Sequence, residues 1–229
     1  MASNFTSAEK MNYRLRNLRW MRDELVMLWG EDGRLNADYC ELSGESGGLT
    51  VELFEAHDVF GAGRVLVGVD RDPAFIAVHQ ARYPRHTWRA GELYTVFSDA
   101  EFDGVAVWNV DASSEVGSPR LEAGVKGLAT RMRVALERHR EIGFMLNCCL
   151  DTRRGGPVGS RVVAHAEMIA AAFTTALGRR RTVEPKLLLP PDKDVSLLDD
   201  PAYEDFEFGC FDVHCTRTLR MINLRLALV

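Results

Sequence analysis

Apolar residues along this chain recur in two alternating patterns, one with the spacing of a helix and one typical of short buried strands. Helical spacing and end signals predict helices over residues 6–29, 49–60, 125–140 and 162–177, and a further helix that starts at Pro73. Short β-branched and apolar runs predict strands over residues 38–42, 64–69, 86–90, 104–110 and 142–149. Two further strand-like runs, 206–216 and 219–229, stand at the C-terminal end with almost nothing between them.

Strands that alternate with helices of this length predict right-handed crossovers and a parallel sheet. The two final runs predict an antiparallel hairpin because so short a connection cannot carry a crossover. We therefore expect an α/β fold, with a Rossmann-like mostly parallel sheet, helices on both faces and a C-terminal antiparallel hairpin. Residues 1–229 are predicted to form a single domain, in which 1–33 is an N-terminal helical extension.

Composition narrows the class of protein. The 229 residues are 46% hydrophobic and 27% charged, with a formal net charge of -5, which disfavours a protein whose main task is to grip a phosphate backbone. Four arginines of the first helix, Arg14, Arg16, Arg19 and Arg22, are interpreted as its solvated face, with a nucleic-acid contact as the alternative.

Apolar runs and cysteine spacing indicate the cellular compartment that we expect. No apolar stretch approaches the roughly 20 residues of a membrane span, so we expect no membrane association. The five cysteines lack the spacing of a disulfide framework, which favours a reducing cytoplasm. Cys210, His214 and Cys215 lack a second ligand pair at zinc spacing, so no metal site is predicted.

Candidate ligand residues follow the strands, because open parallel sheets bind ligands beyond the carboxyl ends of their strands. After the first strand come Glu41 and a turn of small residues that contains Ser43, Gly44 and Gly47. Asp70 follows the second strand and Glu92 the third; Asn109 and Asp111 lie at the end of the fourth. Simpler readings exist: Asp70 as the N-cap of the helix at Pro73, and Glu41 as the partner of a nearby arginine.

The order and spacing of these residues resemble the class I S-adenosylmethionine-dependent methyltransferases over roughly residues 36 to 229. The resemblance implies S-adenosylmethionine as cofactor. It implies that the turn after Glu41, with Ser43, Gly44 and Gly47, approaches the cofactor. Asp70 would then hold the ribose, and Glu92 would contact the adenine.

The glycine turn departs from the family pattern. Ser43 stands in place of the first glycine and Glu45 in place of the second, while Gly47 remains. A carboxylate at the second position adds bulk and negative charge beside the cofactor's methionine part. Either Gly44 takes over the close approach, or cofactor binding is weakened or lost.

The substrate side carries fewer signals. Asp111 is the better candidate for a group that orients or deprotonates an acceptor, and Asn109 the second candidate. Cys148 and Cys149 fall where some RNA pyrimidine methyltransferases place a nucleophile, but within a buried strand we expect them to be structural. The acceptor stays open, with a nucleic acid or nucleotide as one candidate.

We expect a methyltransferase. The alternative is a degenerate methyltransferase-fold protein that acts as a non-catalytic binding or regulatory subunit, which Glu45 favours. A nucleotide-cofactor oxidoreductase of similar fold is a third reading; the terminal hairpin and the short glycine turn count against it.

Overall fold

The structure, a computed structural model, describes residues 7–44, 47–92, 102, 104–115, 118–139, 142–150, 157–177, 205–208, 211–215 and 220–228. The chain divides into two compact units. Unit 1 comprises Met1–Val110, Ala135–Phe144 and Ala227–Val229; unit 2 comprises Asp111–Val134 and Met145–Leu226.

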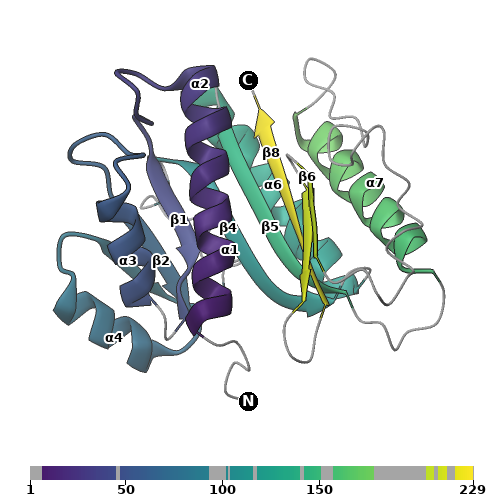
Figure 1. Ribbon diagram of the computed structural model, residues 1–229, viewed down its shortest axis with the longest axis horizontal. Helices are drawn as coiled ribbons and strands as arrows, with labels where there is room; N and C mark the ends of the chain where they lie inside the picture. The colour runs from purple at the N-terminus through teal and green to yellow at the C-terminus, as the bar shows by residue number, and fades with distance from the viewer. Residues whose placement is uncertain are drawn as a thin grey trace. The chain divides into compact units, whose positions relative to one another are not determined.

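A parallel sheet forms the centre of unit 1. Its strands lie in the order β3-β2-β1-β4-β5, as Figure 1 shows for the labelled strands from β2 to β5. The bounds are β1 Asp38–Leu42, β2 Leu66–Asp70, β3 Thr87–Ala90, β4 Val105–Glu115 and β5 Ile142–Leu150. β1 pairs in parallel with both β2 and β4, and β2 with β3. The prediction of an α/β fold with a Rossmann-like parallel sheet is confirmed.

The apolar runs read from the sequence become the core of this sheet. Leu66 and Val69 of β2 and Val107 of β4 have no exposed surface. Burial on both faces explains why these strands are continuous apolar runs rather than alternating ones. The strands begin and end within two residues of the predicted bounds, except that β4 continues to Glu115.

One row of side chains runs across the sheet. The registers place Asn109 of β4, Glu41 of β1, Gly68 of β2 and Trp88 of β3 side by side. Residues in register on neighbouring strands point to the same face. Helices α1 (Ser7–Trp20), α3 (Gly47–Ala56) and α4 (Pro73–Arg82) cover this face, because each has a side chain in contact with the row.

The helices of unit 1 lie where the sequence predicted them, except that the helix predicted over 49–60 begins at Gly47 and ends at Ala56. Their bounds are α1 Ser7–Trp20, α2 Val26–Trp29, α3 Gly47–Ala56 and α4 Pro73–Arg82, and a π-helical turn, Met21–Leu25, joins α1 to α2. Gly30 is the C-cap of α2 and has an extended backbone. Glycine fits there because a Cβ would lie 2.5 Å from the Val26 carbonyl oxygen. Leu25 is fully buried and fills the space above Gly143 of β5.

Unit 2 contains most of α6 (Pro119–His139), α7 (Val158–Leu177) and three antiparallel strands. The strands are β6 Asp205–Phe208, β7 Phe211–Cys215 and β8 Arg220–Leu228. β7 pairs with both β6 and β8. The prediction of one strand over 206–216 was therefore wrong. Phe208 pairs with Phe211 in an antiparallel register, so this run contributes two strands. Among the described residues, no helix has the length and apolar content needed to cross a membrane.

Candidate cofactor site

The carboxyl ends of β1, β2 and β3 meet at one edge of the unit 1 sheet. From β1 the chain builds outward to β2 and β3 on one side, and then to β4 and β5 on the other. Such a reversal of strand order beside β1 is where open α/β sheets bind their ligands. Ser43, Gly44, Asp70 and Glu92, which were predicted from the sequence to contact a ligand, lie at or next to this edge.

The turn after β1 brings the backbone of Gly44 close to Asp70. The Ser43 amide donates to the Val69 carbonyl at 3.1 Å, which holds the buried Ser43 against the end of β2. Gly44 has a φ of 52°, a left-handed conformation that favours glycine. A Cβ on Gly44 would lie 3.7 Å from Asp70 Oδ2. Glu45, the departure from the family pattern, lies outside the described residues.

Helix α4 packs against the same turn. The Nε2 of His79 lies 3.0 Å from the Gly44 carbonyl oxygen, and a carbonyl only accepts, so Nε2 donates this hydrogen bond. A Cβ on Gly47 would lie 2.6 Å from His79 Nε2, and one on Gly48 would lie 2.9 Å from the Tyr83 hydroxyl. These two glycines therefore leave room for side chains of α4.

Asp70 ends β2 and does not cap α4. The N-cap of α4 is Asp72, whose Oδ1 accepts from the Ala74 amide at 2.9 Å. Asp70 Oδ1 accepts instead from the Asp72 amide at 2.7 Å. The alternative reading of Asp70 as the helix cap was therefore wrong, because the chain supplies a second aspartate one residue before Pro73.

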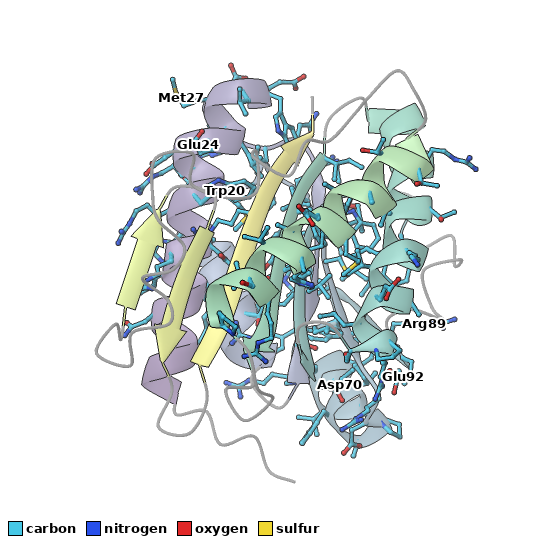
Figure 2. The ribbon with its side chains drawn as sticks, turned by 90° about the vertical axis from the view of Figure 1, so that its right-hand side faces the viewer. Trp20, Glu24, Met27, Asp70, Arg89 and Glu92 are labelled. Carbon is cyan, nitrogen blue, oxygen red and sulfur yellow. The ribbon has the colours of Figure 1, made fainter. Side chains whose placement is uncertain are left out.

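Glu92 lies near Asp70, beyond the next strand. The Gly91 amide donates to the Asp70 carbonyl at 2.9 Å, and Glu92 is exposed. Figure 2 shows the side chains of Asp70 and Glu92 at the same end of the molecule. Two carboxylates thus stand at the edge where the cofactor is expected, beside the Gly44 turn.

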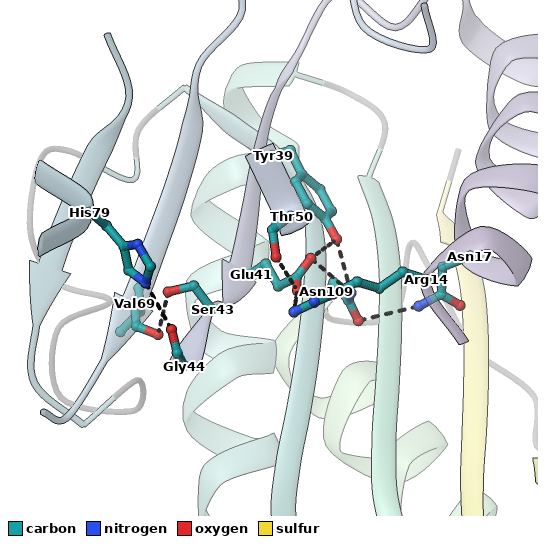
Figure 3. A network of polar contacts seen from close by, with 10 residues as sticks. All are labelled: Arg14, Asn17, Tyr39, Glu41, Ser43, Gly44, Thr50, Val69, His79 and Asn109. Atoms are coloured by element: carbon teal, nitrogen blue, oxygen red, sulfur yellow. Dashed lines mark hydrogen bonds and ion pairs between the residues drawn. The ribbon is translucent and has the colours of Figure 1, made fainter. Parts of the chain in front are cut away.

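Glu41 lies one step further into the sheet, in a buried polar network (Figure 3). Its Oε1 accepts from Arg14 Nε at 2.8 Å, from Arg14 Nη2, and from Thr50 Oγ1 at 2.9 Å. Its Oε2 accepts from the Tyr39 hydroxyl at 2.6 Å and from Asn109 Nδ2 at 3.4 Å. Glu41 is therefore the partner of an arginine, as the simpler interpretation of the sequence had it.

Asn109 takes part in the same network. Its Nδ2 also donates to the Tyr39 hydroxyl at 2.9 Å, and its Oδ1 accepts from Asn17 Nδ2 at 3.4 Å. A small cavity of about 10 Å³, close to the room that one water needs, adjoins this network. It is lined by Arg14, Leu18, Met21, Tyr39, Glu41, Thr50, Leu53, Phe54 and Phe60.

The remaining candidates are placed by backbone alone. Asp111 lies on β4, and Cys148 and Cys149 lie on β5. Their side chains are outside the described part of the chain, so the acceptor-side role of Asp111 and the structural role of the cysteines stay predictions. Within the described ranges, no cluster of three or more His, Cys, Asp or Glu side chains is arranged to hold a metal ion.

Sequence reasoning missed three residues of this region: Arg14, Thr50 and His79. Arg14 was predicted to be solvated, but only 5% of it is exposed, and Glu41 accounts for its burial. Arg19 and Arg22 are exposed as predicted. A buried carboxylate at position 41 requires a cation, and a basic side chain on the first helix was the available signal.

No protein family profile matches the chain, and no curated protein matches it. Solved structures similar to it include a TehB-like SAM-dependent methyltransferase from Corynebacterium glutamicum, with 15% identity over 73% of this chain and 84% of that chain and a TM-score of 0.38. A geranyl diphosphate methyltransferase in complex with GPP and sinefungin has 13% identity over 94% and 79% of the two chains, with a TM-score of 0.44. The trans-methyltransferase CalH, in complex with SAH, has 19% identity over 93% and 58%, with a TM-score of 0.40.

Proposed function

We propose that this chain binds S-adenosylmethionine at the carboxyl ends of β1, β2 and β3 and transfers its methyl group to an acceptor. The observation that carries the proposal is the left-handed Gly44 beside the Asp70 carboxylate. A glycine here lets the backbone approach a ligand closely, and the neighbouring carboxylate accepts hydrogen bonds from a ribose diol. Because Asp72 caps α4, Asp70 is not needed for that task.

Each site residue has a role in this proposal. Gly44 and Ser43 would border the methionine part of the cofactor, Asp70 would accept from the ribose hydroxyls, and Glu92 would contact the adenine. Asp111 orients the acceptor or takes up its proton. When bound, S-adenosylmethionine would supply the methyl group: the acceptor's nucleophilic atom would bond to the methyl carbon as the sulfur–carbon bond breaks, with release of S-adenosylhomocysteine. Positioning supplies most of the rate because the sulfonium already activates the methyl group.

A matched pair of aspartates tests the cofactor site. S-adenosylhomocysteine is expected to raise the melting temperature of the wild type, since a ligand specific for the folded state stabilises it. Asp70→Ala is expected to remove most of this shift. Asp72→Ala is expected to lower the melting temperature of the free protein, because loss of an N-cap costs about 1 kcal/mol, yet to keep the shift. Loss of the shift in both variants, or in neither, contradicts the assignment of Asp70.

The second candidate function is a binding subunit that holds the cofactor without transferring its methyl group. The engagement of Asn109 in the buried network favours it, because that side chain is already bonded to Tyr39 and Asn17. Incubation with methyl-labelled S-adenosylmethionine and a mixture of nucleotides and RNA separates the two. Label transferred to an acceptor supports the enzyme, and tight binding with label retained on the cofactor supports the subunit.

A further inference from the structure

Arg14 of α1 and Thr50 of α3 both bind the carboxylate of Glu41 in β1, next to the turn that carries Gly44. Glu41 lies in β1 before the turn, and Thr50 lies in the first turn of α3 after it. The Thr50 hydroxyl donates to Glu41 Oε1 at 2.9 Å and so bridges the turn. Arg14, from α1, binds the same oxygen. We call Arg14, Glu41 and Thr50 the turn clamp.

We propose that the turn clamp positions the cofactor-binding turn, so that docking of α1 through Arg14 sets the shape of the site. This inference rests on the proposed function. Glu41, two residues before Ser43 and buried with 2% exposure, is a positioning residue rather than a ligand. Its two oxygens already accept from Arg14, Thr50, Tyr39 and Asn109.

The charge of the clamp argues for a geometric role. A buried ion pair contributes little net stability, because desolvation of both charges offsets their attraction. Apolar side chains of similar volume would pack as well at this place, beside Leu53, Phe54 and Phe60. Directional bonds from Arg14 and Thr50 instead fix where β1 ends and α3 begins, and hence the two ends of the turn.

The other hydrogen bonds of Glu41 supply a matched control. Tyr39 donates to Oε2 from within β1, two residues away, and so does not bridge the turn. Thr50→Val and Tyr39→Phe each remove one hydroxyl from the same buried carboxylate while keeping the size of the side chain. Tyr39→Phe also removes the hydroxyl that accepts from Asn109 Nδ2, so it is expected to cost at least as much stability as Thr50→Val. Only Thr50→Val opens the bridge across the turn.

Two measurements compare these variants: calorimetric titration with S-adenosylhomocysteine, and hydrogen exchange of a peptide spanning residues 42–49. Thr50→Val is expected to weaken binding by about tenfold, the equivalent of one hydrogen bond to a charged group, and to speed exchange in the turn. Tyr39→Phe is expected to change neither by more than about twofold. Equal effects of the two variants, or no effect of Thr50→Val, overturn the proposal.

Exchange separates this inference from the proposed function. If the wild type binds no S-adenosylhomocysteine, the proposed function fails, and the exchange rates of the two variants still decide whether the clamp holds the turn. Arg14→Met leaves Glu41 as a buried charge without its cation and is expected to compromise folding. Arg14→Lys keeps the charge and is expected to fold, with exchange in the turn faster than in the wild type, because lysine lacks the forked donors of arginine. If the turn of Arg14→Lys exchanges hydrogen at the wild-type rate, Arg14 does not hold the turn in the way proposed.

Discussion

At the scale of single residues, Gly47, which was predicted from the sequence to contact the cofactor, and its neighbour Gly48 both have a packing role. Gly47 and Gly48 begin α3, where a Cβ would meet His79 or Tyr83 of α4. Gly44 differs, since its left-handed backbone and its carbonyl, which accepts from His79, define the turn itself. Identical residue types within five positions thus serve different purposes, and only the fold distinguishes them.

Gly47→Ala is expected to destabilise the protein by about 1–3 kcal/mol, because the added methyl overlaps the His79 ring and forces it from its place. Gly127→Ala is the control: the same change in α6, where the new methyl meets no atom within 4 Å beyond its chain neighbours and its own helix backbone, is expected to stabilise by roughly 0.5–1 kcal/mol. Urea unfolding of both variants measures the difference. A neutral Gly47→Ala would mean that the His79 ring moves aside at little cost.

At the scale of elements, a histidine ties α3, β2 and β3 together. His86 stands just before β3 and is buried; its Nδ1 accepts from the Leu66 amide at 3.2 Å, and its Nε2 lies 3.3 Å from Glu55 Oε1 of α3. Its ring meets Phe54 edge-on, with centroids 5.6 Å apart. Burial lowers the pKa of His86 below its ordinary 6.5, although the Glu55 carboxylate raises it in part. The neutral ring is therefore the form that this junction stabilises.

Stability is expected to fall as the pH drops below about 6.5, because the unfolded His86 takes up a proton more readily than the folded one. The contribution is fully present above the unfolded pKa and is lost as the pH falls through the lower folded pKa. Unfolding free energies between about pH 7 and pH 5 test this, and His86→Gln is expected to flatten the dependence because glutamine does not titrate. Burial lowers the pKa of His165 to about 4, but both proteins keep this residue, so it does not account for a difference between their pH dependences. An identical slope in wild type and variant would contradict the assignment.

At the scale of the whole chain, local patterns predicted most of unit 1, and contacts between distant residues produced the exceptions. Strand and helix bounds depend on apolar runs and on end signals such as Pro73, which are local. The partnership of Arg14 with Glu41 spans 27 positions, and that of His79 with Gly44 spans 35. No periodicity encodes such pairs, so Arg14 was placed on a solvated face. In the run 206–216, Gly209 was the unused sign that the strand breaks.

Residues 1–33, predicted to be an N-terminal extension of the domain, contribute buried side chains to unit 1. Leu18, Met21 and Leu25 are at least nine-tenths buried, and Arg14 neutralises Glu41 from the same helical segment. Burial of three such side chains contributes roughly 1.5–3 kcal/mol each. Their sum is comparable to the about 5–15 kcal/mol by which a typical domain is stable.

Removal of residues 1–33 is therefore expected to abolish cooperative unfolding, since it exposes the face of β1 and β5 that this segment covers and leaves Glu41 buried without its cation. Thermal unfolding followed by near-ultraviolet circular dichroism measures this. The control lacks only residues 1–6 and keeps every described contact of α1, so it and the full chain are both expected to unfold in one sharp transition. If the chain without residues 1–33 also unfolds sharply, the segment is a dispensable extension, and the turn clamp cannot depend on Arg14.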